Sequence, residues 1–203
     1  MNRCAVIVFA KAPRPGHAKT RLIPALGERG AAQLAERLMH ATLRQAIDAA
    51  IGPVELCVTP DRDHPAFTAA ASQHPIIVTD QGDGDLGQRM AHAFERVLAT
   101  QPCALLIGTD APGLGATYLR DAARALEQAD AVFGPAADGG YTLVGLKRPV
   151  PSLFAAMRWS HDRVMADTRE RIAAARLRHV ELPLLHDIDE PANLAHLPDS
   201  MRS

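Results

Sequence analysis

The segment from residue 11 to residue 22 concentrates positive charge in a way that suits phosphate chemistry. It follows an apolar run, residues 5–10, that predicts a buried strand. Pro13, Pro15 and Gly16 favour turns and exclude a helix. A rigid cationic loop at the end of a buried strand is suited to bind phosphate oxygens, and the alternative is a surface loop with solvated cations. The segment contains no acid, and its permanent cations are Lys11, Arg14, Lys19 and Arg21.

One carboxylate, Asp110, follows the apolar run 104–109 and precedes a turn at Ala111 and Pro112. In open α/β sheets, ligands bind beyond the carboxyl ends of the strands. Because Mg²⁺ prefers one or two carboxylates together with phosphate oxygens, Asp110 suits a divalent ion beside a bound phosphate. The alternative is that Asp110 caps a helix beginning near Thr117.

The segment Asp138-Gly139-Gly140-Tyr141 combines an acid with two glycines. Glycines let a backbone approach a ligand closely or adopt a positive φ. The alternative is a tight turn with aspartate at its first position.

Two more acids, Asp187 and Asp189, point to the same side if their segment is extended. Such a pair repels unless a cation or a hydrogen-bond donor lies between the carboxylates. The alternative is that Asp189 or Glu190 caps the last helix, and both interpretations can hold together.

Residues 80–89 interleave acids with glycines but have no glutamate at the twelfth position of a calcium loop. The glycines allow a helix to begin close to a bound group, with N–H donors at Leu86 and Gly87. Ordinary turn chemistry explains the segment equally well. The phosphate-loop pattern, the dinucleotide pattern, a zinc H-E-x-x-H and a hydrolase G-x-S-x-G are all missing from the sequence.

Alternating strands and helices must position these residues. The alternation predicts βαβ crossovers and a mainly parallel sheet. The run 139–146 follows the preceding strand too closely for a crossover helix, so we expect this pair to run antiparallel or in different registers. Ser160 is the expected N-cap of one helix. The expected strands are 4–10, 54–59, 76–79, 104–109, 131–134, 139–146 and 178–182, and the expected helices are 28–50, 86–100, 117–128, 159–175 and a terminal turn at 191–197.

The composition of the 203 residues favours one α/β domain, residues 1–203, with a core of small aliphatic side chains, because 47% are hydrophobic and only 4% aromatic. A formal net charge of −1 argues against a nucleic-acid surface. The scattered Cys4, Cys57 and Cys103 indicate buried free thiols in a reducing compartment. No signal pattern or membrane-length apolar run is present, so we expect a cytoplasmic chain without a membrane partner.

Together these motifs resemble the GT-A-like bacterial transferases of the nucleotide-diphospho-sugar transferase superfamily. Within it, the chain is most similar to a family labelled glycosyltransferase and associated with radical-SAM enzymes and arsenosugar biosynthesis. More distant is the similarity to phospholactate or phosphoenolpyruvate guanylyltransferases, which share the elements at 19–22 and 187–191 but depart at 108–112. The resemblance spans nearly the whole chain and is carried by residues 11–22, 83–89, 108–112, 134–145, 159–160 and 187–194.

The resemblance implies a GT-A fold, a three-layer α/β/α arrangement with a mixed, mostly parallel sheet and the nucleotide over the first strand's loop. It implies catalytic roles for Asp110 and Asp138, and Mg²⁺ or Mn²⁺ held by Asp110 with Asp187 or Asp189. The acceptor side would contain Gly139, Gly140 and Tyr141. The implied nucleotide- and phosphate-binding residues are Lys11, Arg14, Lys19, Thr20, Arg21 and Gly87.

Three functions stay open at this point. The first, favoured by the family label, is a glycosyltransferase that takes a nucleotide-diphospho-sugar donor and a small-molecule acceptor. The second is a guanylyltransferase-like nucleotidyltransferase that couples an NTP to a small phosphorylated acid. The third is a non-catalytic nucleotide-binding module. We expect a monomer or a homodimer that binds no nucleic acid.

Overall fold

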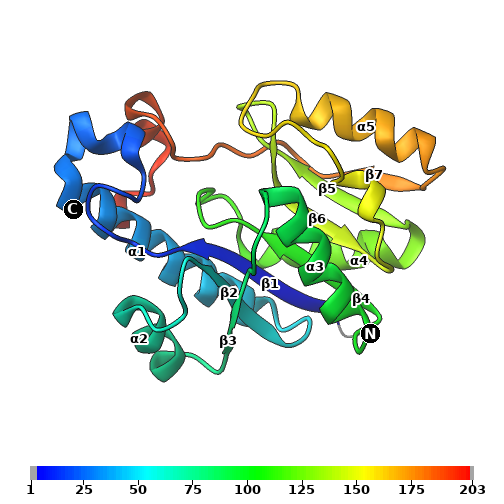
Figure 1. Ribbon diagram of the computed structural model, residues 1–203, viewed down its shortest axis with the longest axis horizontal. Helices are drawn as coiled ribbons and strands as arrows, with labels where there is room; N and C mark the ends of the chain where they lie inside the picture. Colours follow the sequence, from blue (N-terminus) through cyan, green and yellow to red (C-terminus); the bar gives the residue numbers. More distant parts are fainter. Residues whose placement is uncertain (1–3, 202–203) are drawn as a thin grey trace.

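A mixed β-sheet forms the centre of the computed structural model, which describes residues 4–201 (Figure 1). Its strand order is β3-β2-β1-β4-β6-β5-β7. Neighbouring strands are parallel except that β6 runs antiparallel to both β4 and β5. The expected mixed, mostly parallel sheet is therefore confirmed, including the antiparallel pair. The strands are β1 (Cys4–Lys11), β2 (Val54–Thr59), β3 (Ile77–Asp80), β4 (Cys103–Ile107), β5 (Ala131–Pro135), β6 (Tyr141–Leu146) and β7 (His179–Glu181).

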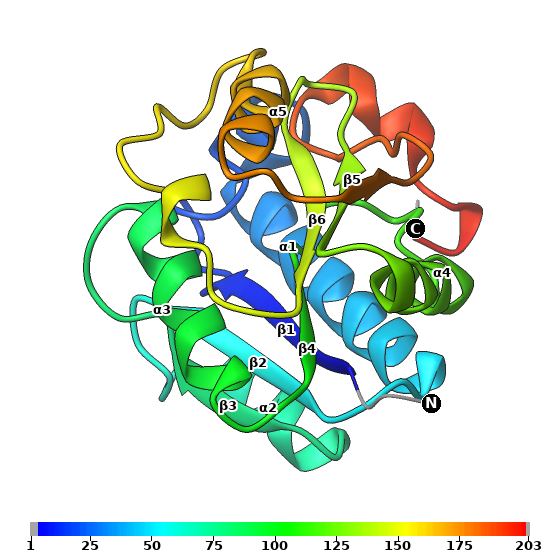
Figure 2. The same ribbon diagram turned by 90° about the vertical axis from the view of Figure 1, so that its right-hand side faces the viewer.

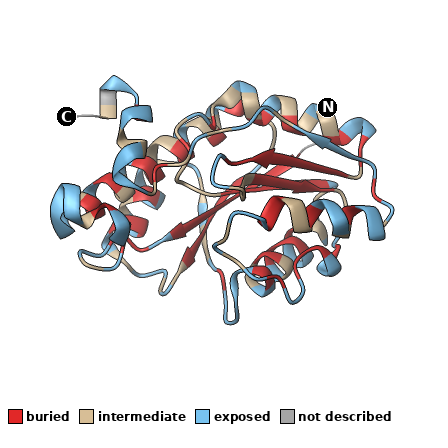
Figure 3. Cartoon of the chain, turned by 90° about the horizontal axis from the view of Figure 1, so that it is seen from above, coloured by how far each residue is buried: buried red, intermediate tan, exposed pale blue. Residues whose placement is uncertain are grey.

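Helices cover both faces of the sheet, which gives the three layers expected of the fold. Alternate β1 residues point to opposite faces: Val6 and Val8 pack in one core cluster, and Ile7 and Phe9 pack in another. The first cluster includes residues of α1, α2 and α4, and the second includes residues of α3 and α5. Figure 2 shows α1 and α4 on one side of the sheet and α3 on the other, and Figure 3 shows the buried strands between them. The helices are α1 (Ile23–Ala49), α2 (Pro65–Gln73), α3 (Leu86–Leu98), α4 (Ala116–Gln128) and α5 (Val164–Ala174).

Three helical details differ from the expectation. Helix α1 begins at Ile23 instead of residue 28 and is kinked at Gly27, whose φ is 70°. The alanine-rich helix α2 was not expected; it begins at Pro65, where the fixed φ of proline suits a first helical turn. Helix α5 starts at Val164 instead of residue 159, and its N-cap residue is Arg163. Ser160 has a φ of 63° and lies in the preceding loop, so its expected capping role is wrong.

The strand ends that matter for function gather at one edge of the sheet. Residues Lys11 and Thr59 are partners at the carboxyl ends of β1 and β2, and Val8 pairs with Ile107 of β4. Because β6 is antiparallel to β4, the residues that precede β6 lie at this same edge. The loops after β1 and β4 and the turn before β6 therefore converge.

The C-terminal segment also reaches this edge. After β7 it crosses the molecule toward α1, as the orange-red part of the ribbon shows (Figure 1). It is tied on the way by a bridge between Ala136 and Leu185 and by a hydrogen bond in which the Ile188 N–H donates to the Asp110 carbonyl, 2.8 Å. Ile188 is fully buried in a third core cluster with residues of α1. Residues 187–189 are thereby fixed beside the loop after β4.

Two chain-wide expectations can be compared with the described residues. Cys4, Cys57 and Cys103 are buried and form no disulfide within residues 4–201, as expected. Within residues 4–201, none of the helices combines the length and the apolar character that crossing a membrane requires.

Candidate functional site

Lys19 lies between the basic loop and the acids that were identified separately in the sequence. Its φ of 45° is left-handed and turns the chain into a short helical turn, Thr20–Leu22. Its Nζ lies 2.6 Å from Asp110 Oδ1 and 3.2 Å from Asp189 Oδ1, and it donates a 2.6 Å hydrogen bond to the Ile188 carbonyl. Burial alone would lower the pKa of Lys19, but the carboxylates of Asp110 and Asp189 together raise it. Lys19 is therefore a charged, buried link between two loops.

Two of the other three cations of the basic loop pair with acids from distant parts of the chain. Arg14 forms an ion pair with Asp61, and Arg21 lies 3.9 Å from Glu190 with both side chains exposed. Lys11 Nζ instead donates to the His17 carbonyl of the same loop at 2.9 Å. The loop itself has no acid, but the fold brings acids to Arg14, Lys19 and Arg21.

Asp110 stands at the end of β4 with its carboxylate turned toward Lys19. It does not cap the following helix, because the N-cap of α4 is Gly115, which has no side-chain cap. The capping alternative for Asp110 is therefore excluded, and the side chain faces the cavities described below.

Asp187 and Asp189 flank the buried Ile188 and lie near Asp110 and Asp138. Burial, followed by the charges of Asp138, Asp189 and Asp110, raises the pKa of Asp187 above its ordinary value. Glu190 is the N-cap residue of the terminal turn Pro191–His196. Asp189 is therefore not needed as a cap, and the helix cap and the pair Asp187 and Asp189 are separate features of the same segment.

The turn before β6 shows why its glycines are needed. Asp138 Oδ1 accepts a 2.8 Å hydrogen bond from the Gly140 N–H, which is the tight-turn arrangement considered above. Gly139 has a φ of 90°, and a side chain on it would collide with the Asp162 carbonyl of the neighbouring loop. The turn is therefore packed against residues 154–163, and Asp138 still lines a cavity.

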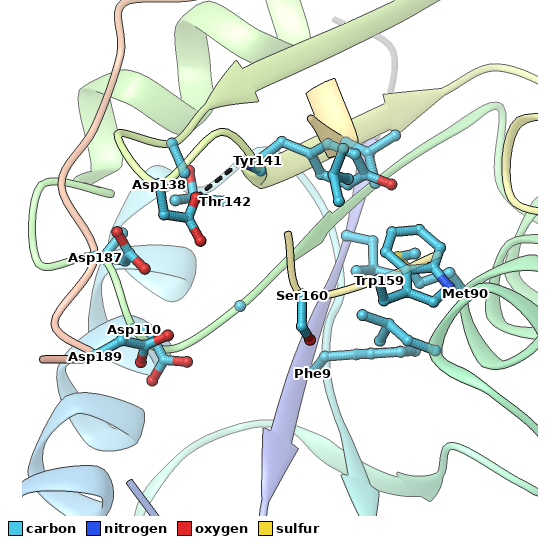
Figure 4. A pocket seen from close by; sticks show the side chains of 18 of the residues that line it. Phe9, Met90, Asp110, Asp138, Tyr141, Thr142, Trp159, Ser160, Asp187 and Asp189 are labelled. Carbon is cyan, nitrogen blue, oxygen red and sulfur yellow. Dashed lines mark hydrogen bonds between the residues drawn. The ribbon is translucent and has the colours of Figure 1, made fainter. Parts of the chain in front are cut away.

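A cavity of about 280 Å³, here called the Trp159 pocket, opens between the acids and a group of aromatic and aliphatic side chains. Figure 4 shows the carboxylates of Asp110, Asp138, Asp187 and Asp189 at one end and Trp159, Tyr141, Phe9 and Met90 at the other. The acids come from three loops, and the aromatic end comes from β1, α3, β6 and the loop before α5.

A second cavity of about 330 Å³, here called the basic cleft, adjoins the first. Lys11, Lys19 and Arg89 line it, and Arg89 Nε is held by the Gly84 carbonyl at 2.8 Å. The side chain of Gln81 is buried there and donates to the carbonyls of Ala10 and Cys57. The two cavities share five lining residues, which are Phe9, Leu86, Gly108, Asp110 and Asp189.

Four of the expected phosphate-binding residues do not line either cavity: Arg14, Thr20, Arg21 and Gly87. Arg14, Thr20 and Arg21 are exposed. Gly87 is buried in α3, and a side chain on it would strike the Phe154 carbonyl and the Trp159 ring. The glycine at position 87 is explained by this close packing.

Sequence reasoning assigned Tyr141 to the acceptor side but missed Phe9, Met90 and Trp159 at the same end of the Trp159 pocket, and it missed the contribution of Gln81 and Arg89. Phe9 and Met90 belong to apolar stripes that look like ordinary core, and Trp159 was expected inside a helix. One sequence feature could have indicated that Trp159 belongs to the site. It is the only tryptophan of the chain, and with Ser160 it forms one of the segments that carry the family resemblance.

The donor set suits a hard divalent ion, although the described residues contain no ready-made group of three or more metal-binding side chains. Asp110 and Asp189 both reach Lys19 Nζ, so their carboxylates lie close together. Carboxylates alone, without cysteine or histidine, fit Mg²⁺ or Mn²⁺, and Mg²⁺ commonly takes one or two protein carboxylates and completes its shell with water and phosphate. Such an ion would share these two acids with Lys19.

Comparison with solved structures agrees with the fold. A protein of Desulfovibrio desulfuricans G20, described as a candidate nucleotide-diphospho-sugar transferase, is 29% identical with a TM-score of 0.85, over 94% of this chain and 84% of that one. A nucleotidyl transferase of Methanothermobacter thermautotrophicus is 15% identical with a TM-score of 0.69, over 100% and 99%. A 4-diphosphocytidyl-2C-methyl-D-erythritol synthase of Anaerococcus prevotii is 9% identical with a TM-score of 0.62, over 99% and 97%.

No curated protein matches the chain by sequence. A family model does: it is described as an uncharacterized protein conserved in bacteria (DUF2064), and it matches residues 42–161. This region contains β2 to β6 and both the Asp110 and the Asp138 loops. The chain therefore belongs to the DUF2064 family, within the GT-A-like nucleotide-diphospho-sugar transferase superfamily.

Proposed function

We propose that this protein is a transferase that takes its group from a nucleotide-activated donor, most simply a glycosyltransferase using a nucleotide-diphospho-sugar. The observation that carries the proposal is the placement of Asp110 and Asp189 at the boundary of two adjoining cavities, with Lys19 holding both. The likeness to the Desulfovibrio protein and to nucleotidyl transferases supports a nucleotide as the donor.

In this proposal the donor's diphosphate occupies the basic cleft. Lys11 and Arg89 line the cleft, and their charges would stabilise the negative charge that builds on the leaving phosphate. Lys19 adds positive charge but is already committed to two carboxylates, so its first task is to fix their positions. The phosphate-binding set that we propose is thus narrower than the sequence alone implied.

A divalent ion, Mg²⁺ or Mn²⁺, would be held by Asp110 and Asp189, with Asp187 close by. When bound, such an ion acts as a Lewis acid on the diphosphate oxygens. The second substrate would enter the Trp159 pocket, where Asp138 lies at the acidic end. We assign Asp138 the task of accepting the proton of the attacking hydroxyl.

The test is a thermal-shift panel of nucleoside triphosphates, UDP-sugars and GDP-sugars, each with and without Mg²⁺. A ligand at 100 times its Kd stabilises the folded state by about 2.7 kcal/mol, which is readily measured. Stabilisation by a nucleotide sugar supports glycosyl transfer, whereas preference for a bare triphosphate supports the nucleotidyltransferase alternative. If turnover follows in neither case, the protein is a binding module.

The variant Asp110→Asn tests the proposed metal site, because it removes one carboxylate and keeps the size of the side chain. We expect it to remove the Mg²⁺-dependent part of the thermal shift while the protein stays folded. The melting temperature without ligand should fall, because buried Lys19 loses one of its two carboxylate partners. Asp121→Asn is the matched control, because Asp121 lies on the exposed side of α4 and pairs only with Arg124. An unchanged Mg²⁺ effect in Asp110→Asn would refute the metal assignment.

A further inference from the structure

The Trp159 pocket has a charge and hydrogen-bonding pattern that restricts what it can hold. We propose that it binds an uncharged or positively charged polyhydroxylated molecule of single-ring size, a sugar or an amino sugar, and that it rejects phosphorylated and carboxylated molecules. This inference rests on the proposed function, because it names the chemical class of the second substrate. It also separates the two transferase hypotheses, since the nucleotidyltransferase alternative requires a phosphorylated acid.

The charge of the pocket is strongly one-sided. Among residues 4–201, its lining contains four aspartates, one histidine (His161) and neither lysine nor arginine. Lys19 forms its ion pairs with Asp110 and Asp189 and lines the basic cleft, not this pocket. Even if a divalent ion joins those two acids, the carboxyl groups of Asp138 and Asp187 still face the ligand. An anion placed here would lose its hydration and meet carboxylates without a lysine or arginine as its partner, which is costly.

The aromatic end contributes ring surface, and the hydrogen bonds come from the other polar groups of the pocket. Tyr141 Oη and Trp159 Nε1 are buried away from its open space, so they are not available to a ligand. The four aspartates, Thr142 and Ser160 line the pocket. A ligand would therefore offer donor groups to the carboxylates and can exchange hydrogen bonds with the two hydroxyls.

Sugar hydroxyl groups suit this lining, because each can donate a hydrogen bond to a carboxylate and accept one from a neighbouring hydroxyl. The apolar face of a sugar ring can also pack on the rings of Tyr141 and Trp159, which meet edge to face at 6.4 Å. A volume of about 280 Å³ admits one ring and little more. An alkyl chain would leave the carboxylates without hydrogen-bond donors, and a multiply charged acid would face repulsion.

The aromatic end is held in place before any ligand arrives. Gly87 of α3 lets the Phe154 carbonyl and the Trp159 ring approach the helix, and Gly139 lets the Asp162 carbonyl approach the turn before β6. The Met165 N–H donates a 2.8 Å hydrogen bond to the Gly139 carbonyl. The loop that carries Trp159 is thus fixed on two sides, so selectivity arises from a preformed surface.

Because the chain has one tryptophan, its fluorescence reports this pocket directly. Four hexose probes differ in charge: glucose is neutral, glucosamine cationic, and glucuronate and glucose 6-phosphate anionic. All four keep the sugar ring, and glucuronate matches glucose closely in size. Titrated at pH 7 and constant ionic strength, glucosamine is expected to bind about fivefold more tightly than glucose. Glucuronate and glucose 6-phosphate are expected to bind at least about tenfold more weakly than glucose.

The variants Asp138→Asn and Asp187→Asn test the cause of this order. Asparagine at 138 keeps an acceptor for the Gly140 N–H, so the turn is preserved. Each variant should lose about fivefold in glucosamine affinity and bind the two anionic probes more tightly than the unmodified protein does. Asp121→Asn on the exposed face of α4 should change none of the four affinities.

The inference fails if either anionic probe binds as tightly as glucose, or if none of the four probes changes the Trp159 emission. The thermal-shift panel of nucleotides is measured on the same protein samples. The proposed function and the inference about the Trp159 pocket can then fail independently. Nucleotide stabilisation without sugar binding overturns only the inference about this pocket. Sugar binding in the expected charge order without any nucleotide effect supports the pocket and overturns the nucleotide-dependent function.

Discussion

Lys19 has a different task from that of an exposed phosphate-binding lysine. Its side chain is 5% exposed and its three short contacts go to Asp110, Ile188 and Asp189, all of them more than 90 positions away in the sequence. A charge buried in this way holds two carboxylates at a distance that their mutual repulsion would otherwise oppose. It also competes with any divalent ion for the same oxygens.

This competition gives a prediction for Lys19→Met, which keeps the length of the side chain and removes its charge. The free energy of unfolding should fall by about 1–3 kcal/mol without divalent ions, because two carboxylates lose a charged partner. Adding Mg²⁺ or Mn²⁺ should raise the melting temperature more in the variant than in the unmodified protein.

Melting curves with and without added Mg²⁺ check both statements. Lys11→Met is the control, since Lys11 is exposed and, among the described residues, its side chain donates to the His17 carbonyl and pairs with no carboxylate. Equal Mg²⁺ effects in the Lys19 variant and the unmodified protein would show that these acids do not hold the ion.

The sequence identified most of the site's charged residues but could not identify their partners. Asp110 and Asp138 could be assigned to one edge of the sheet because strand ends converge there. The pairs Arg14–Asp61 and Lys19–Asp189 could not, since 47 and 170 positions separate their members. Phe9 and Met90 of the aromatic end were missed for another reason: they satisfy the apolar pattern of their own strand and helix, so the pattern cannot show that they also face a cavity.

At the scale of elements, the segment 187–189 depends on Ile188. This side chain is fully buried with Leu22, Leu34 and Leu38, and its two neighbours are the aspartates of the site. Ile188→Ala should cost about 2–4 kcal/mol of stability through the cavity it leaves, and it should also weaken the binding of nucleotide with Mg²⁺.

Leu197→Ala is the matched control for Ile188→Ala, because Leu197 belongs to the same cluster but lies away from the two cavities. Urea denaturation should report a loss of stability in both variants. Only Ile188→Ala should change nucleotide affinity at temperatures where both proteins are folded. Equal affinities would show that the backbone of 187–189 is positioned by other contacts.

An ion pair joins β2 to α3 on the side of the sheet away from α1. Glu55 is buried, and its carboxylate accepts hydrogen bonds from Arg96 at 2.5 and 2.8 Å. Arg96→Met should lower the free energy of unfolding by about 2–4 kcal/mol, because it leaves a buried carboxylate without its partner. The double variant Glu55→Leu with Arg96→Met should recover much of the loss.

Urea titrations of the two single variants and the double variant form a thermodynamic cycle that measures this coupling. Arg124→Met, which breaks an exposed pair on α4, should change stability by less than about 0.5 kcal/mol. If Arg96→Met lowers the free energy of unfolding as little as Arg124→Met does, water replaces the guanidinium at Glu55 and the prediction is wrong.

The elements were predictable where apolar patterns were long or continuous. Strands β1, β2 and β4 to β6 were expected within two residues of their ends, because each lies between covered faces and contains few polar residues. Helix α2 was missed because its nine residues have a weak apolar stripe in which only Ala66, Phe67 and Ala70 are buried. The start of α5 was wrong because Trp159 and Ser160 suggested a helix start, whereas that segment packs as a loop on Gly87 and Gly139.

At the scale of the whole molecule, acid stability should depend on the contact between α1 and α2. The rings of His40 and His74 lie 5.8 Å apart between these helices. Burial has the largest effect and lowers the pKa of His40. The charge of Glu36 comes next and raises it, and smaller effects of His74 and Arg44 lower it, so the net shift of the pKa is downward. Below pH 6.5 the unfolded chain therefore takes up this proton more readily than the folded one, so stability is lost as the pH falls through the folded pKa.

His40→Gln should flatten the dependence of the unfolding free energy on pH between about 7 and 5. His92→Gln on α3 is the comparison, since no contact of that kind involves it among the described residues. Urea denaturation at several pH values measures the slope. The same slope in His40→Gln and the unmodified protein would assign the acid sensitivity to other groups.

The crossing of the chain's last segment over the sheet edge has a consequence for how activity would be lost. Two of the four carboxylates belong to residues joined to the rest mainly through Ile188, the Ala136–Leu185 bridge and Lys19. Peripheral segments of this kind can detach at lower free energy than the central sheet. Partial heating, or proteolytic cleavage near residue 185, would then abolish nucleotide binding. Circular dichroism would still report a folded protein. An assay of function would be a more sensitive measure of damage than any spectroscopic measure of secondary structure.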